Sequence, residues 1–437
     1  VTDSNGCSSQ GGGVAVDVES ANPVIHIDSM DFAVHALEPF VLGVQDMDDA
    51  FTYSWKKAKV VGDEVIKDFT SAAANGTYSD SLSVDDGDIY YVLQGSSKQL
   101  AGCHGWDTVY VYKIPNAPII EIAAAETPHD LKLTFNVDET EEALVDGYRL
   151  MHNKWDGYAI ESEYSEKAVR AHDNPIYDLK EADLDTLEFF YVMVSRTIDI
   201  RQNGTKKTYF SLPSDTVGYK VDVLQCRENT EDGTGNNPIA WIFDVPDIKT
   251  SEDLFEVIGE GIDAIRAYRF DQQAMTQSTN RNPYYGEDPG EAKYEGVFDL
   301  HKGEIYEITA LAKDKTLGII QPQRIVQYGF LGVKSEYISK RSPGEMTNND
   351  LICMPCHKIE LKKTDQLFED FPESTIDAVR LWDFQQQAWV YSTFVNSYWY
   401  EDPVNEVKFE YIYIIKPGIA MQISVLKDDN DNSFIWK

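Results

Sequence analysis

The amino-acid sequence predicts an all-β protein built of tandem β-sandwich modules that follow one another end to end in an elongated chain. Two observations lead to this prediction. The segment IDAIRAYRFDQQAM at residues 262–275 returns as IDAVRLWDFQQQAW at residues 376–389, so the last two modules are duplicated units. Short alternating runs rich in β-branched and aromatic residues follow the copies, such as IYEIT at 305–309 and MQISV at 421–425. Such alternation is typical of half-buried strands.

The composition argues against several classes of protein. The 437 residues include 38 Lys and Arg against 74 Asp and Glu, which leaves a formal net charge of −36. A charge of this sign disfavours nucleic acid and anionic membrane surfaces as partners. No apolar run approaches the roughly 18 residues of a membrane-spanning helix. The motifs GxSxG, HExxH, GxxxxGK[ST] and GxGxxG are absent. We therefore expect no enzyme activity and no membrane insertion.

The first 18 residues, VTDSNGCSSQGGGVAVDV, combine an Asn-Gly turn with an alternating V-x-V run. This combination is typical of a β-hairpin that closes a sheet. The segment resembles the end of the tandem immunoglobulin-like (Ig-like) repeats in very large secreted surface proteins of gliding and gut Bacteroidota. The resemblance implies that residues 1–18 close a preceding Ig-like module, so that the chain begins inside a longer array. It also implies that the partner of Cys7 would lie before residue 1.

The next segment carries a Trp on a strand, in FTYSW at 51–55, and a second strand after DDGD at 85–88. It ends with Gly102-Cys103 and an alternating run, TVYVY, at 108–112. This segment resembles an Ig-like or PKD-like module, in which a core Trp and a tyrosine corner occupy such positions. The corner itself departs from the usual spacing, because Ile89 stands where Tyr is expected.

A third segment carries LKLTF at 131–135, VDGYRL at 145–150 and FYVMV at 190–194. This set of strands resembles a fibronectin type III sandwich, and its second and third signals return in both later copies. The expected fold is therefore an Ig/PKD-like module followed by three fibronectin type III-like modules. The expected divisions are residues 1–18 (closing hairpin), 19–115 (module one), 116–225 (module two), 226–345 (module three) and 346–437 (module four, a duplicate of module three).

Two duplicated aromatic blocks are candidate ligand platforms. The blocks NPYYGEDP at 282–289 and NSYWYEDP at 396–403 place Tyr and Trp beside carboxylates. Exposed aromatic rings in such surroundings stack on sugars. Packing in the core of each sandwich is the favoured alternative, because both copies keep the block. The candidate ligand-binding residues are Tyr284, Tyr285, Tyr398, Trp399 and Tyr400.

The string CMPCH at 353–357 matches the covalent haem c attachment pattern. Haem also requires a distal ligand and usually a helical wrap, and the surrounding β pattern predicts neither. We therefore expect no haem. A disulfide between Cys353 and Cys356, or two packed thiols at a module boundary, is favoured over haem and over a zinc site.

Two acidic runs, DMDD at 46–49 and DDNDN at 428–432, place oxygen ligands at alternating positions, as calcium loops do. Both lack the Gly and Glu of an EF-hand, and a solvated acidic turn is the favoured alternative. The candidate calcium ligands are Asp46, Asp48, Asp428, Asn430 and Asn432. No other cofactor is expected.

These patterns favour a non-enzymatic segment of an extracellular, bacterial cell-surface adhesin or stalk. The alternatives are a surface glycan-binding protein of a polysaccharide-uptake system and the accessory modules of a secreted hydrolase. The expected partners are other modules of a longer chain, a cell-envelope anchor or secretion component, and a glycan or protein receptor.

Overall fold

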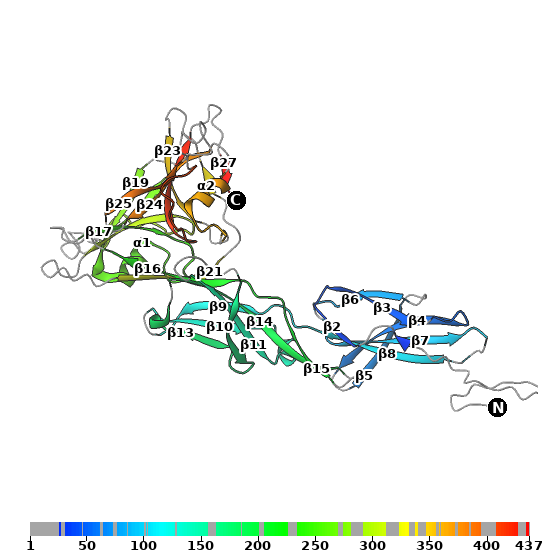
Figure 1. Cartoon of the computed structure of the whole chain (residues 1–437). Helices are drawn as coiled ribbons and strands as arrows, with labels where there is room; N and C mark the ends of the chain where they lie inside the picture. Colours follow the sequence, from blue (N-terminus) through cyan, green and yellow to red (C-terminus); the bar gives the residue numbers. More distant parts are fainter. Residues whose placement is uncertain are drawn as a thin grey trace, which may run out of the picture.

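The computed structural model confirms an all-β chain of tandem modules, with two short α-helices among the residues that it describes (Figure 1). No helix in this part of the chain is long and apolar enough to cross a membrane. The described residues are 26–27, 31–45, 47–61, 64–72, 77–84, 86–99, 102, 104–126, 129–155, 163–184, 186–200, 205–225, 234–269, 274–280, 292–311, 323–331, 337–339, 347–354, 358, 360–371, 375–383, 386–394, 408–426 and 434–436.

Module one is a two-sheet sandwich with the strand order of an Ig-like fold. Trp55 and Tyr91 are fully buried between its sheets, which confirms the core Trp that the sequence predicts. The Tyr91 hydroxyl donates to Asp80 Oδ2 at 2.6 Å. One sheet has the order β1 (His26–Ile27), β3 (Pro39–Gln45), β6 (Thr77–Ser81); the other has β2 (Phe32–Val34), β8 (His104–Lys113), β7 (Ile89–Ser97), β4 (Phe51–Val61), β5 (Glu64–Ala72), with β2 parallel to β8.

Module two has the sheet order of a fibronectin type III domain. Leu131, Leu133 and Phe135 alternate with polar residues along β10 and are buried, as the sequence predicts. Its first sheet has the order β13 (Ile176–Leu179), β10 (Leu131–Asn136), β9 (Ile119–Ala124). Its second sheet has the order β12 (Ser165–Ala171), β11 (Gly147–Lys154), β14 (Leu187–Ile200), β16 (Val217–Leu224). β15 (Thr205–Phe210) pairs with the C-terminal half of β14. The 3-10 turns η1 (Glu142–Leu144) and η2 (Glu181–Asp183) lie outside the sheets.

Modules three and four share one architecture, a four-stranded antiparallel sheet. In each, a helix connects the strand that comes first in the chain to the strand that comes second. Even the irregularities agree: a β-bulge follows Ile262 in one copy and Ile376 in the other. The sheets are β17 (Thr234–Ala240), β20 (Ile305–Leu311), β18 (Ile262–Arg269), β19 (Ala274–Thr279), and β23 (Thr347–Cys353), β26 (Ala420–Leu426), β24 (Ile376–Asp383), β25 (Ala388–Phe394).

The two helices are α1 (Ser251–Ile258), followed by the turn η3 (Gly259–Gly261), and α2 (Thr364–Asp370). Thr250 and Asp253 form a capping box at the start of α1, which satisfies backbone donors that a helix end leaves free. Leu254 and Phe255 form the buried face of α1. Leu367 and Phe368 form the buried face of α2. The sequence pattern predicts neither helix, because two turns are too short for a clear helical period.

Two strands from the sequence range of module three pair with its neighbours. β21 (Gln323–Phe330) runs antiparallel to β16 and extends the second sheet of module two. β22 (Tyr337–Ser339) pairs with β27 (Phe434–Trp436) at the end of the chain. Because β21 covers an edge that β16 would otherwise expose, it joins module three to module two. One hydrophobic cluster accordingly includes buried residues of both modules.

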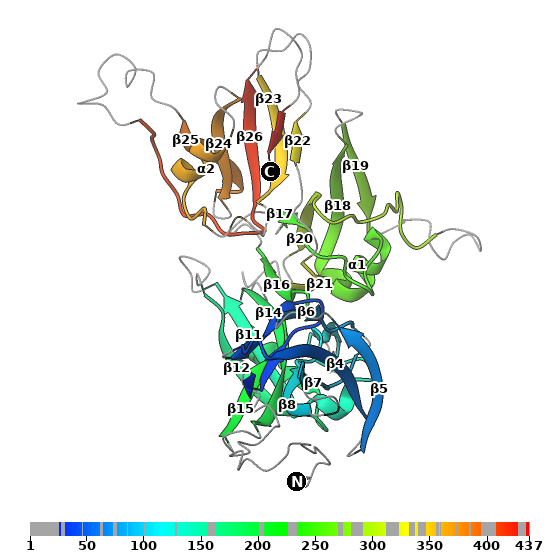
Figure 2. The ribbon, with the colours of Figure 1, turned by 90° about the vertical axis from the view of Figure 1, so that its right-hand side faces the viewer.

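Modules one and two lie in line, whereas modules three and four lie side by side beyond module two (Figures 1 and 2). The repeats in the sequence predict four modules end to end. The structure differs because β21 returns to module two, so module three cannot extend the array by its full length. Residues of modules two, three and four consequently meet around one cleft.

Candidate functional site

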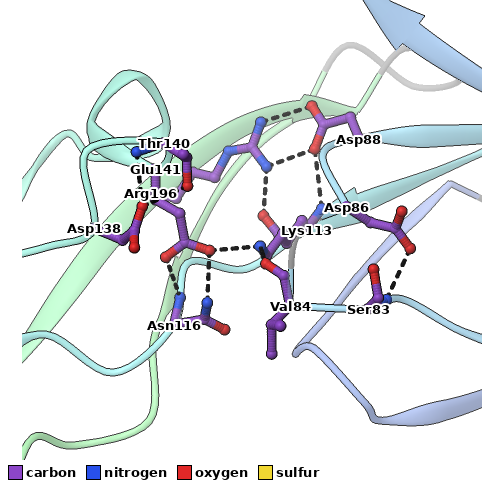
Figure 3. A network of polar contacts seen from close by, with 10 residues as sticks. All are labelled: Ser83, Val84, Asp86, Asp88, Lys113, Asn116, Asp138, Thr140, Glu141 and Arg196. Atoms are coloured by element: carbon purple, nitrogen blue, oxygen red, sulfur yellow. Dashed lines mark hydrogen bonds and ion pairs between the residues drawn. The ribbon is translucent and has the colours of Figure 1, made fainter.

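The joint between modules one and two contains a buried ion pair. β8 ends at Lys113 and β9 begins at Ile119, so a short connection separates the two sandwiches. The Lys113 ammonium lies 2.5 Å from Glu141 Oε1, and the two side chains are 2% and 3% exposed. Lys113 Nζ also donates to the Val84 carbonyl oxygen (Figure 3). The side chain of the last residue of β8 in module one is thus paired with a carboxylate of module two.

The connecting segment binds to the same carboxylate. Asn116 donates to Glu141 twice, from its backbone N–H to Oε2 at 2.9 Å and from Nδ2 to Oε1 at 2.8 Å. Glu141 therefore holds both the end of β8 and the connection that follows it. A buried carboxylate is stable only when such donors satisfy its oxygens.

A second ion pair crosses the joint at its partly exposed side. Arg196 Nη1 and Nη2 donate to the two carboxylate oxygens of Asp88, each at 2.7 Å. Arg196 Nη1 also donates to the carbonyl oxygen of Lys113, and Asp88 Oδ1 accepts from the backbone N–H of Lys113 at 3.0 Å. Bidentate arginine–carboxylate pairs constrain orientation as well as distance. The two ion pairs, side by side in Figure 3, therefore fix how module two is rotated against module one.

The residues on the two sides of the joint come from different strands and turns. Asp88 lies next to β7 and Lys113 ends β8, whereas Glu141 precedes η1 and Arg196 lies on β14. The turn before η1 is stabilised by Asp138, whose Oδ1 accepts from Thr140 Oγ1 at 2.6 Å and from its N–H at 2.9 Å. These hydrogen bonds lower the pKa of the Asp138 carboxyl. The turn thus presents Glu141 in a defined place.

The joint between modules two and three contains a buried polar network on the β16–β21 pairing. Lys220 Nζ lies 2.8 Å from Asp222 Oδ1 and donates to the Ala240 carbonyl oxygen at 3.0 Å. Gln327, on β21, donates to Asp222 Oδ2 at 2.8 Å and accepts from the Ile242 backbone N–H at 2.9 Å. Each polar group named here has a partner from the other module or from the neighbouring strand, so the network specifies the register of the joint.

The sequence-predicted ligand platform lies outside the described residues, as do most of the predicted metal ligands. Asp48 is described, and its carboxylate accepts from the Ala50 backbone N–H at 2.8 Å in a local turn. Within the described part of the chain, no group of three or more His, Cys, Asp or Glu side chains is arranged to hold a metal ion. The residues outside the description are Tyr284, Tyr285, Tyr398, Trp399, Tyr400, Asp46, Asp428, Asn430 and Asn432.

The predicted pairing of Cys353 with Cys356 is not resolved by the structure, because Cys356 lies outside the described residues. Cys353 ends β23, and its Sγ contacts the Met354 carbonyl oxygen at 3.5 Å. The disulfide and the exclusion of haem therefore stay predictions.

Sequence reasoning missed the residues of both joints. A signal for one of them exists: Lys113 follows the alternating run VYVY of β8, where an apolar residue would be usual at the end of a strand that enters an interface. A charged residue that is buried at such a place needs a partner. Its partner is one of 74 acidic residues, and no local pattern distinguishes Glu141 from the others.

Comparisons with known proteins do not place the chain in a family. No protein-family model matches it, and no curated protein matches it. Three solved structures aligned with it are the FN1–FN3 domains of chicken CNTN1, murine CEACAM1b, and domains A168–A170 of titin, with 10%, 13% and 12% identity and TM-scores of 0.22, 0.22 and 0.23.

These alignments cover 44%, 42% and 43% of this chain. They span 62% of the CNTN1 chain, 92% of the CEACAM1b chain and 60% of the titin chain, so the chain spans less than two thirds of the CNTN1 and titin structures. TM-scores of this size indicate no function for this chain.

Proposed function

We propose that this chain is a non-enzymatic segment of a cell-surface adhesin or stalk, in which tandem modules hold a binding surface at a set distance and angle. The observation that supports this proposal is the joint between modules one and two. Linked domains move against one another by default. Bending at this joint would separate Lys113 from Glu141 and Arg196 from Asp88, and a buried charge that loses its partner is strongly destabilising.

The proposal places the chain outside the cell, among other modules of a longer protein. Its partners would be those modules, a cell-envelope anchor or secretion component, and a receptor that is a glycan or a protein. A stiff joint suits this role because a stalk that bends freely does not keep its binding surface away from the envelope.

Single-molecule FRET tests the stiffness of the joint. Fluorophores are placed on the full chain through non-natural amino acids at Val41 and Val169, which are exposed on modules one and two. We expect one narrow distance distribution for the wild type. The double variant Glu141→Ala, Arg196→Ala should broaden it, because both inter-module ion pairs are lost.

A matched control separates the joint from a general effect of losing ion pairs. Arg149 and Glu166 form a salt bridge within module two whose side chains are both exposed, so Arg149→Ala, Glu166→Ala should leave the distribution narrow. A broad distribution in the wild type, or an unchanged one after loss of the joint pairs, would contradict the stalk. Adhesion itself is tested by the retention of beads coated with the chain on epithelial monolayers and glycan arrays.

Glycan binding is a second candidate function, supported by exposed tyrosines on module four. Tyr391 on β25 is exposed, and the Arg380 guanidinium lies 4.4 Å from its ring centroid. Tyr411 and Tyr413 are exposed in the segment before β26. Tyr391→Ala should abolish any glycan-array signal, whereas Tyr209→Ala in module two, which removes a ring that Lys207 contacts at 4.8 Å, should not.

A further inference from the structure

A cleft of about 320 Å³ lies where modules two, three and four meet. Its size is at the lower end of the range for small-molecule sites, about 300–1,000 Å³. β16 supplies one wall, β17 and β21 supply another, and the loop before β26 closes the third side. Gly418 in that loop has φ +71°, and a Cβ there would meet the Ile242 side chain at 3.0 Å. Glycine thus lets module four approach module three closely enough to form the cleft.

Two of the charged groups in the cleft neutralise each other. Lys220 pairs with Asp222 at 2.8 Å, and the second oxygen of Asp222 accepts from Gln327 at 2.8 Å. Lys220 is also bound to the Ala240 carbonyl oxygen. The two charges that face the cleft from β16 are therefore paired within the protein.

Lys416 contributes a further positive charge to the cleft. It lines the cleft from module four, and within the described part of the chain no carboxylate forms an ion pair with it. Burial lowers the pKa of its ammonium; the charge of Asp222 opposes this and that of Lys220 adds to it. Across the cleft, Arg324 Nη1 on β21 lies 3.8 Å from a carboxylate oxygen of the exposed Glu181. The lining thus contains Lys220, Lys416 and Arg324 against Asp222 as its one carboxylate.

The rest of the lining is largely apolar. Val221 of β16, Ile239 of β17 and Ile419 of the loop all face the same space. Such a cleft suits a ligand that has one anionic group and an apolar body, because a few charged groups orient a ligand that apolar walls hold.

We propose that this cleft binds a small carboxylate ligand, with Lys416 as the principal cation, Arg324 as the second, and the apolar part of the ligand against Val221, Ile239 and Ile419. One carboxylate matches Lys416, the lysine of the lining that forms no ion pair with a described carboxylate. A ligand held there touches three modules at once, so it joins module four to module two.

Isothermal titration calorimetry on the full chain tests the proposal with defined probes. Phenylacetate and glucuronate represent an apolar carboxylate and a sugar carboxylate; phenylacetamide and glucose are their uncharged counterparts, and inorganic phosphate is the other anion. We expect at least one carboxylate to bind, its uncharged counterpart not to bind, and phosphate to bind more weakly. Whichever carboxylate binds shows whether the natural ligand is an apolar acid or an acidic sugar.

Three variants test the residues. Lys416→Met and Arg324→Gln should each weaken carboxylate binding at least about tenfold, since a hydrogen bond to a charged group is lost. Lys206→Met, which removes an exposed lysine of β15 outside the cleft, should leave it unchanged. Lys416→Met should not lower the melting temperature, because it removes a buried amine rather than a matched ion pair.

The melting temperature separates a ligand site from a structural lysine. A structural role predicts a lower melting temperature for Lys416→Met, with no binding of any carboxylate to the wild type. Wild-type protein that binds none of the carboxylates, carboxylate binding that survives Lys416→Met, or tighter binding of phosphate than of either carboxylate would each overturn the proposal.

Discussion

Breaking the ion pair between Lys113 and Glu141 should loosen the joint between modules one and two more than the substitution of any exposed residue does. Among the described residues, Lys113→Met leaves the buried Glu141 carboxylate with the Asn116 donors, and Glu141→Leu leaves the buried Lys113 ammonium with the Val84 carbonyl oxygen. The side chains are 2% and 3% exposed, so water cannot replace the lost partner. Loss of one member of such a pair costs about 3–5 kcal/mol.

The double variant Lys113→Met, Glu141→Leu should be less destabilised than the sum of the two single variants. It removes both charges together and leaves two apolar side chains in a buried place, which is often tolerated. We expect an interaction energy of about 2–3 kcal/mol. The corresponding value for the exposed pair Arg149 and Glu166 should stay within about 0.2–1 kcal/mol.

Native-state hydrogen exchange read by mass spectrometry measures these energies locally. Peptides that span residues 113–118 and 138–146 report the opening of the joint, and peptides from β4 and β11 report the module cores. A melting temperature reports on the whole multi-module chain, which does not unfold in one step, so it does not show whether the joint itself has opened. Strictly additive effects of the two substitutions at residues 113 and 141 would refute the argument that the pair acts as a unit.

Three further predictions concern other parts of the chain. Burial by itself would raise the pKa of the Asp80 carboxyl, but hydrogen bonds from Tyr91, Ser81 and Lys57 lower it below its usual value. Its contribution to stability is therefore complete above the unfolded pKa of about 3.9 and is lost as pH falls through the lower folded value. In an acid titration followed by fluorescence, Asp80→Asn should lack the loss of stability that the protonation of Asp80 causes in the wild type. Gly218→Val should destabilise module two, because a Cβ there would lie 2.7 Å from the Glu188 carbonyl oxygen; thermal melts that match wild type would contradict this. Trp399→Ala should cost about 3–5 kcal/mol if the aromatic block is core, whereas lost glycan binding at unchanged stability would favour the platform.

The strands and repeats were predictable because the information that specifies them is local. Alternation of LKLTF at 131–135 places three side chains on one face whatever the rest of the chain does. The duplicated segments predicted a shared architecture for modules three and four, and the structure shows even the same bulge after Ile262 and Ile376. The short helices were missed since their apolar residues, Leu254 and Phe255 in one copy, cover barely two turns.

The candidate site was not predictable in the same way. The aromatic blocks and acidic runs drew attention because they are contiguous in sequence. The groups that hold the joints are not contiguous: Arg196 and Asp88 lie 108 residues apart, and Asn116 and Glu141 lie 25 apart. With 74 carboxylates and 38 basic residues in the chain, residue type alone does not select those pairs.

By itself, the sequence determined the all-β class, the tandem modules and the duplication at the end of the chain, because strand period and repeat length follow from neighbouring residues. Only the tertiary structure decided how the modules meet. β21 leaves module three for the free edge of β16, and this pairing brings Lys416, Lys220 and Arg324 of three modules around one cleft. Edge pairing is a contact between distant backbones, which hydrogen bonding permits for almost any side chains, so composition and period do not specify it.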